Sequence, residues 1–331
     1  MKRLFLMSTL CVVVLSAFAL KRDPVYCEAR LNGAETKIEF HIVDDDMRPV
    51  ADAKVRALLG MNFREKGTWV DGATDTNGVF VLSGKTCGDE ILLWLSKDGY
   101  YNSSKTICYA TMGAEHEVKD GKWQPYGEIQ LLRLRKINAS SALILMSERK
   151  FSNTRCINKW LGYDIKAYDF VAPYGRGSVS DFEVFIDWDG KWLPDYKGMG
   201  VIIRFPEAFS GYCPINVIAE SEFIGPYSAS ARFAYLKEAS FSERMLDDGR
   251  WERNQFDQRK CWVVRTRCKV DDDGRMISAN YAVVHNIELS CDQDGVAGIC
   301  VIGAFNPTPN DTNLEPLRER RKRGKRKMLQ R

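Results

Sequence analysis

Histidine, which often serves as a general base or a metal ligand, is scarce in this chain. The 331 residues include three, His41, His116 and His285, which lie far apart in the sequence. A histidine-ligated metal site or a histidine-based triad needs such groups to converge on one point. The sequence also lacks a G-x-S-x-G elbow and a phosphate-binding glycine loop. These features point away from an enzyme, and we predict no catalytic residue, no metal ligand and no cofactor.

Two acidic runs resemble parts of a calcium-binding loop. They are Asp-Asp-Asp-Gly at 271–274 and Asp-Gln-Asp-Gly at 292–295. An EF-hand loop beginning at Asp271 would need a glutamate at its twelfth position, where this chain has Ala282. Because Asp-Gly is also the usual signal of a tight hairpin turn, we predict hairpins at both places.

Aromatic side chains give a better hint of a ligand. Trp188, Trp192 and Tyr196 bracket an Asp-Gly turn. Exposed aromatic rings in β-sandwiches can stack against the flat apolar face of a sugar ring. Trp188 and Trp192 could instead be cross-strand neighbours that cover the end of a hydrophobic core. The three residues are therefore candidates for a carbohydrate-stacking site, with core packing as the alternative.

Nine of the ten cysteines lie beyond the first nineteen residues. In an oxidising compartment this number predicts several disulfides and one free thiol, and buried unpaired cysteines are the alternative. Cys261 and Cys268 belong to one predicted strand and would point to opposite faces, so they could not pair. Cys291 and Cys300 flank a predicted turn and could face each other across a hairpin.

The first nineteen residues have the pattern of a secretory signal peptide. Lys2 and Arg3 precede an apolar run over 4–20, and Ala-Phe-Ala at 17–19 supplies an A-x-A cleavage site. An uncleaved membrane anchor is the alternative, because about 17 apolar residues is the lower limit for crossing a bilayer. We predict cleavage, export to the periplasm, cell surface or extracellular space, and no further membrane span.

The elements that would position these residues are strands. Polar and apolar residues alternate over 37–42, and a continuous apolar run over 91–95 has the length of a strand buried on both faces. Turn residues (Asp, Asn and Gly) recur at short intervals. After a linker over 20–36, the first half of the chain is therefore predicted to be an antiparallel, Ig-like β-sandwich.

Three motifs in this half follow the patterns PVxGAxV, TDxxGxFxL and GY. They are VADAKV at 50–55, TDTNGVFVL at 74–82 and KDGYY at 97–101. The region 37–135 thereby resembles the carboxypeptidase regulatory-like, or transthyretin-like, β-sandwich domain, although Asp52 replaces the usual glycine. The resemblance implies a non-catalytic module, and the TDTNG motif predicts a tight turn in which Gly78 takes a positive φ. Less specifically, the whole chain resembles uncharacterised exported bacterial proteins that carry this domain before a second β domain.

Residues 136–316 are predicted to form a second antiparallel β domain. Its strand-like stretches run into Asp-Gly turns, and Pro206, Pro214 and Pro226 argue against long helices in its middle. The polar segment 236–256 predicts a short helix or a long loop.

Charge is distributed unevenly between this body and the C-terminus. Residues 317–331 hold nine basic residues and one acidic residue, a net charge of +8, whereas residues 20–316 hold 37 basic and 43 acidic residues, a net charge of −6. A block of like charge without apolar periodicity predicts a disordered tail. The tail could contact a polyanion, such as an acidic polysaccharide or an anionic lipid face, and export argues against a specific nucleic acid partner. A solvated tail with no specific partner is the alternative.

These patterns predict an all-β, exported, non-catalytic binding or structural protein of the cell envelope. Its expected partner is an envelope component or a glycan. The alternative is a carbohydrate-binding protein or a glycan-directed enzyme that carries its site in the second β domain.

Overall fold

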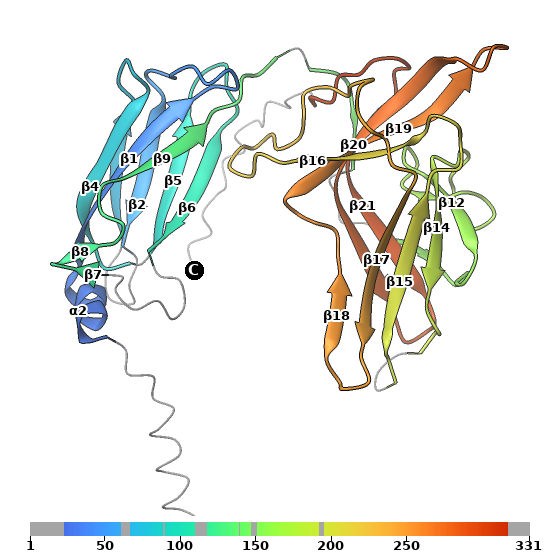
Figure 1. Ribbon diagram of the computed structural model, residues 1–331, viewed down its shortest axis with the longest axis horizontal. Coiled ribbons are helices and arrows are strands. Elements are labelled where there is room, and N and C mark those ends of the chain that lie inside the picture. Colours follow the sequence, from blue (N-terminus) through green and yellow to red (C-terminus); the bar gives the residue numbers. More distant parts are fainter. Residues whose placement is uncertain are drawn as a thin grey trace, which may run out of the picture. The chain divides into compact units, whose positions relative to one another are not determined.

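A computed structural model describes residues 23–60, 67–88, 90–109, 118–138, 140–146, 151–191 and 195–316 (Figure 1). In this part of the chain nearly all regular structure is strand, and α2 (Pro24–Asn32) is the one helix, which confirms the predicted all-β class. The predicted leader over 1–19, the basic tail over 317–331 and Trp192 lie outside the described residues. The described residues include no helix with the length and apolarity required to cross a bilayer.

The chain divides into two compact units. The first comprises the residues up to Lys136 together with 220–222, and the second comprises 137–219 and the residues from Phe223 onward.

The first unit is a sandwich of two sheets (Figure 1). One sheet has the order β4-β1-β8-β7 with β9 also on β1, and the other has the order β3-β2-β5-β6. The strands are β1 (Ala34–Val43), β2 (Lys54–Leu59), β3 (Thr68–Ala73), β4 (Val79–Thr86), β5 (Glu90–Ser96), β6 (Ser103–Cys108), β7 (Val118–Lys119), β8 (Lys122–Trp123) and β9 (Glu128–Arg133). Most pairs are antiparallel, but β1 runs parallel to both β8 and β9, which the prediction did not include.

The core of the first unit lies between its sheets. The alternation predicted for β1 is confirmed, because Ile38, Phe40 and Ile42 are fully buried. The apolar run in β5 was predicted to be buried on both faces, and this is wrong for Trp94, which is 39% exposed. Its indole packs instead against that of Trp69 on the outer face, with ring centroids 5.4 Å apart.

Residues 24–32, predicted to be linker, form α2. Asp23 caps the helix by accepting a hydrogen bond from the Val25 N–H at 2.9 Å, and Pro24 occupies the first turn, where its missing N–H has no cost. Tyr26 places its ring edge against Trp123, and Ala29 is buried in the core. Apolar contact therefore orders this stretch although its sequence has weak helical amphipathicity.

The predicted turn at 75–78 is confirmed. The Asp75 carboxylate accepts hydrogen bonds from the N–H groups of Asn77 and Val79, at 2.9 and 2.7 Å, and Gly78 has φ +73°. A Cβ at Gly78 would lie 2.5 Å from the Ile42 carbonyl oxygen.

Gly78→Ala is therefore expected to destabilise the first unit by about 2 kcal/mol or more, through both positive φ and a backbone clash. Urea denaturation measures the change. Gly99→Ala is the matched control, since Gly99 has φ +80° with open space around its Cβ position. Equal losses in the two variants would show that the clash with Ile42 is relieved without cost.

Residues 220–222 complete the open edge of the first unit's second sheet. Ser221 forms an antiparallel bridge with Ser103 of β6, the Ser104 N–H donates to the Glu220 carbonyl at 2.7 Å, and the Glu222 N–H donates to the Asn102 carbonyl at 2.9 Å. A segment that follows β6 by more than a hundred residues in the sequence thus covers its polar edge.

The second unit contains two larger sheets (Figure 1). They have the orders β10-β21-β20-β19-β16, with β11 also on β21, and β13-β12-β14-β15-β17-β18. The strands are β10 (Ile144–Met146), β11 (Ser152–Thr154), β12 (Trp160–Asp164), β13 (Asp169–Phe170), β14 (Phe182–Asp187), β15 (Gly198–Arg204), β16 (Gly211–Asn216), β17 (Glu238–Met245), β18 (Trp251–Asn254), β19 (Lys260–Val270), β20 (Met276–Cys291) and β21 (Ala297–Asn306).

The sheet that contains β19, β20 and β21 is buried on both faces. One face packs against the other sheet and forms with it the main core of the unit. The opposite face packs against loop residues such as Ala229 and Leu314 and forms a smaller core. This explains why each of these strands carries a continuous apolar run rather than strict alternation, over 261–264, 281–284 and 299–302.

A bulge at Arg267 changes which side chains of β19 face which core. The register of β19 against β20 shifts between Thr266 and Lys269, and Arg267 has φ +51°. The extra residue brings Cys268 to the side of the smaller core that holds Cys261, so the predicted opposite orientation is wrong.

The Arg267 side chain turns inward and binds two aspartates. Its Nε lies 2.8 Å from Asp181 Oδ1, and its Nη2 lies 2.9 Å from Asp181 Oδ2 and 2.8 Å from Asp164 Oδ1. Burial opposes ionisation of Asp164, but three backbone N–H groups and the guanidinium hold its pKa below the usual value. Asp164 is therefore charged, and the arginine connects both sheets of the second unit.

The predicted disulfides are absent from the described residues, where nine cysteines occur and none is bonded to another. Cys291 and Cys300 do not face each other, because the register pairs Cys291 with Ala297 and Cys300 with Glu288. The alternative, cysteines that pack as small apolar side chains, fits Cys261 and Cys300, which are fully buried.

Candidate functional site

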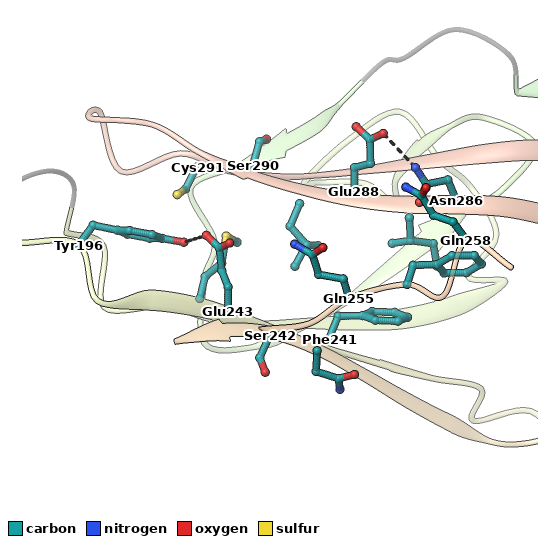
Figure 2. Close-up of a pocket in the computed structure, with 15 residues that line it drawn as sticks. Tyr196, Phe241, Ser242, Glu243, Gln255, Gln258, Asn286, Glu288, Ser290 and Cys291 are labelled. Carbon is teal, nitrogen blue, oxygen red and sulfur yellow. Dashed lines mark hydrogen bonds between the residues drawn. The ribbon is translucent and has the colours of Figure 1, made fainter. Parts of the chain in front are cut away.

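A pocket of about 620 Å³ lies within the second unit, between the β17–β18 hairpin and the end of β20 (Figure 2). This volume is in the range that holds a small organic ligand. The pocket floor is apolar and includes Met199, Phe241, Phe256 and Ile287. The polar side chains around it are Tyr196, Ser242, Glu243, Asn254, Gln255, Gln258, Asn286, Glu288 and Ser290.

The hairpin supplies one wall, although residues 236–256 were predicted to be a short helix or a loop. Asp247, Asp248 and Gly249 form its turn, and Gly249 has φ +80°. Side chains two residues apart on a strand share a face, so Glu243 lies on the same face of β17 as the buried Phe241. The core contact of Phe241 thus fixes the direction of the Glu243 carboxylate toward the pocket.

The opposite wall is an open strand edge. β20 pairs with β19 only as far as the match of Val284 with Trp262, whereas its pairing with β21 continues to Cys291. In the part of the chain that the structure describes, residues 286–291 of β20 thus pair with β21 alone. This wall of the pocket therefore begins where the pairing of β19 with β20 ends.

Tyr196 closes one end of the pocket (Figure 2). Its hydroxyl donates to Glu243 Oε1 at 2.6 Å. Burial and this acceptor both raise the pKa of Tyr196, so the phenol stays protonated and remains a donor. Burial likewise raises the pKa of the neighbouring Cys291 thiol, which argues against a reactive thiolate there.

Side-chain amides dominate the rest of the polar lining. Asn286 Nδ2 donates to Glu288 Oε1 at 3.0 Å, and Gln255 lies between the two glutamates in Figure 2. An amide offers both donors and an acceptor, as a carbohydrate hydroxyl does. The described residues contain no group of three or more His, Cys, Asp or Glu side chains arranged to hold a metal ion.

The structure separates the three predicted stacking residues. Trp188 is 2% exposed in the main core and donates through Nε1 to the Lys191 carbonyl at 3.1 Å, so it offers no ring face to a ligand. The prediction is therefore wrong for Trp188, for which the core-packing alternative holds. Trp192 lies outside the described residues, and Tyr196 lines the pocket.

Sequence reasoning missed Trp251, whose ring stacks on Tyr196 with centroids 5.7 Å apart and planes 26° apart. Trp251 is 40% exposed. The signal that could have found it is the Asp-Asp-Gly turn directly before it, which predicts a hairpin by the rule applied elsewhere in the chain.

The two acidic runs form hairpin turns, as predicted. In the turn that joins β19 to β20, the Asp271 carboxylate accepts hydrogen bonds from the N–H groups of Asp273 and Arg275, at 3.1 and 2.8 Å. The Asp292 carboxylate does the same for Asp294 and Val296, at 2.9 and 3.1 Å, between β20 and β21. These side chains thus satisfy backbone donors of the turns.

Comparison with known proteins gives distant likenesses. No protein-family model and no curated protein matches the sequence. Among solved structures, 3-chlorocatechol 1,2-dioxygenase from Rhodococcus opacus is 12% identical with a TM-score of 0.25, covering 32% of this chain and 61% of its own. Catechol 1,2-dioxygenase from Acinetobacter radioresistens is 11% identical with a TM-score of 0.25, covering 33% and 54%.

A DUF3823 family protein from Parabacteroides merdae covers 82% of this chain and 99% of its own, with 11% identity and a TM-score of 0.20. The chain spans little more than half the length of the two dioxygenases, covering 61% and 54% of them. Likenesses at these TM-scores carry no argument about function.

Proposed function

We propose that the protein is an exported, non-catalytic binding protein of the cell envelope whose second unit binds a carbohydrate in the pocket between β17, β18 and β20. The observation that carries the proposal is the lining itself. A protonated tyrosine, carboxylates and several amides surround an apolar floor. This combination suits a ligand whose ring has an apolar face and a rim of hydroxyl groups.

The first unit fits the proposal as a supporting module. We propose that it is a carboxypeptidase regulatory-like domain, and the turn at 75–78 and the buried Leu82 support this.

Export rests on the leader pattern over 1–19, and a polyanion contact through residues 317–331 remains a separate proposal. Removing those residues should abolish retention on heparin at moderate salt if the tail makes that contact.

Gln255→Ala is expected to weaken glycan binding about tenfold, because it removes hydrogen bonds from the centre of the pocket. A glycan array of neutral, N-acetylated and uronic acid chains would first identify the ligand, and isothermal titration calorimetry would then measure its affinity. Gln293→Ala is the matched control, since Gln293 is exposed in the β20–β21 turn outside the pocket.

Two results would count against the proposal. One is the absence of any bound glycan on the array with folded protein. The other is capture of an extended peptide that pairs with the open edge of β20, which would make the pocket a peptide site.

A further inference from the structure

The pocket-facing surface of the β17–β18 hairpin continues beyond the pocket. Register pairs Glu243 with Arg253 and Met245 with Trp251. Side chains alternate along each strand and paired residues share a face, so these four lie on one face of the hairpin. Glu243 belongs to the pocket, and the surface therefore extends from it toward the hairpin turn.

Trp251 is the main feature of this extension. Its ring stacks on Tyr196, which itself lines the pocket, so aromatic surface runs from the pocket to Trp251 without a break. Although one face of the indole lies against Tyr196, the residue is 40% exposed, and its strand partner Met245 is 37% exposed. A large aromatic side chain is thus held in place by a neighbour while part of its surface meets solvent.

Polar side chains also lie beside Trp251, on its side toward the pocket. Arg253 Nε lies 3.7 Å from Glu243 Oε2, and the two side chains are 58% and 33% exposed. Donors and an acceptor therefore lie between the pocket and the indole, where hydroxyl groups of a longer carbohydrate would lie. An isolated exposed tryptophan would lack both this continuity and these polar groups.

From this continuity we infer that the site has a second ring-binding position on Trp251, and that its ligand is an oligosaccharide rather than a single sugar. The inference rests on the proposed function. One ring lies in the pocket, with its hydroxyls on the amides and Glu243. The next ring stacks on the indole face and lies near Arg253. Affinity should therefore rise with chain length up to the point at which Trp251 is covered.

The test is calorimetric titration with cello-, xylo- and chito-oligosaccharides of one to six rings. Wild type should bind the longer members of the preferred series at least about tenfold more tightly than the monosaccharide. Trp251→Ala should lose that gain and keep the monosaccharide affinity, whereas Trp251→Phe should recover part of the gain. Trp69→Ala, which removes an exposed tryptophan of the first unit, should behave as wild type.

The outcomes separate the two proposals. Binding that is equally tight for every chain length, or a length gain that survives in Trp251→Ala, would overturn the second ring position and leave the pocket proposal intact. Absence of binding by every oligosaccharide to folded wild-type protein would overturn both. Loss of monosaccharide binding in Trp251→Ala would show that the indole only supports Tyr196 and would also overturn the second position.

Discussion

Replacing Arg267 with leucine is expected to lower the free energy of unfolding of the second unit by about 3–5 kcal/mol. The arginine is 20% exposed, and its two partners, Asp164 and Asp181, are 4% and 0% exposed. Without the guanidinium, two buried carboxylates would lie close together with no cation between them. Removing one member of a buried ionic group costs more than removing the whole group, because the remaining charge stays desolvated.

Differential scanning calorimetry should show this loss as a fall in the melting temperature on the order of 10 °C. Arg259→Leu is the control, because Arg259 is 89% exposed and pairs with Asp257 at the surface, so its replacement should change little. A melting temperature in Arg267→Leu close to that of this control would mean that the bulge, not the ion pair, holds the two sheets together.

Acidification from pH 7 to pH 4 is expected to destabilise the second unit through His285. Burial lowers the pKa of this histidine from 6.5 to about 4. Its Nδ1 has no hydrogen-bond partner among the described residues, and Gly225 packs so closely that a Cβ there would lie 3.3 Å from the His285 Cε1. The imidazole is therefore held neutral by an apolar environment.

The direction of the effect follows from proton uptake. Below about pH 6.5 the unfolded chain binds a proton at His285, whereas the folded chain does so only near pH 4, so stability falls across this interval. The difference between these two pKa values corresponds to a loss of about 3 kcal/mol in the free energy of unfolding. Urea denaturation at several pH values should show this loss in wild type and a smaller loss in His285→Gln.

His41→Gln is the control, since His41 is half exposed beside Glu39. This variant should lose as much stability between pH 7 and pH 4 as wild type does. If His285→Gln loses as much stability as wild type between pH 7 and pH 4, other groups cause the acid sensitivity.

The sequence predicted those parts of the fold whose signals are local. Alternation predicted the buried face of β1, the TDTNG motif predicted the turn at 75–78, and Asp-Gly pairs predicted the turns at 271–274 and 292–295. The disulfide prediction was wrong because a cysteine count says nothing of register. The predicted orientation of Cys268 was wrong because the one-residue bulge at Arg267 reverses the alternation of side chains along β19. No residue type in the strand predicts that bulge.

The candidate site was only partly predictable for a related reason. Tyr196 was found because it lies near a recognisable turn. Most of the remaining lining comes from β17, β20 and the segment from β18 to Gln258, whose contact depends on where β19 stops pairing with β20. Trp188 and Tyr196 are close in sequence, and only the packing of the main core decides that the first is buried and the second lines the pocket.

The bridge between Ser103 and Ser221 also has a consequence for synthesis on the ribosome. The Asn102 side chain donates to Glu222 Oε1 across 120 residues of sequence. Until that later segment has been translated, the nascent first unit presents the outer edge of β6 uncovered. An open edge can recruit another chain, so the interval between translation of β6 and of 220–222 is the period in which nascent chains are most prone to associate.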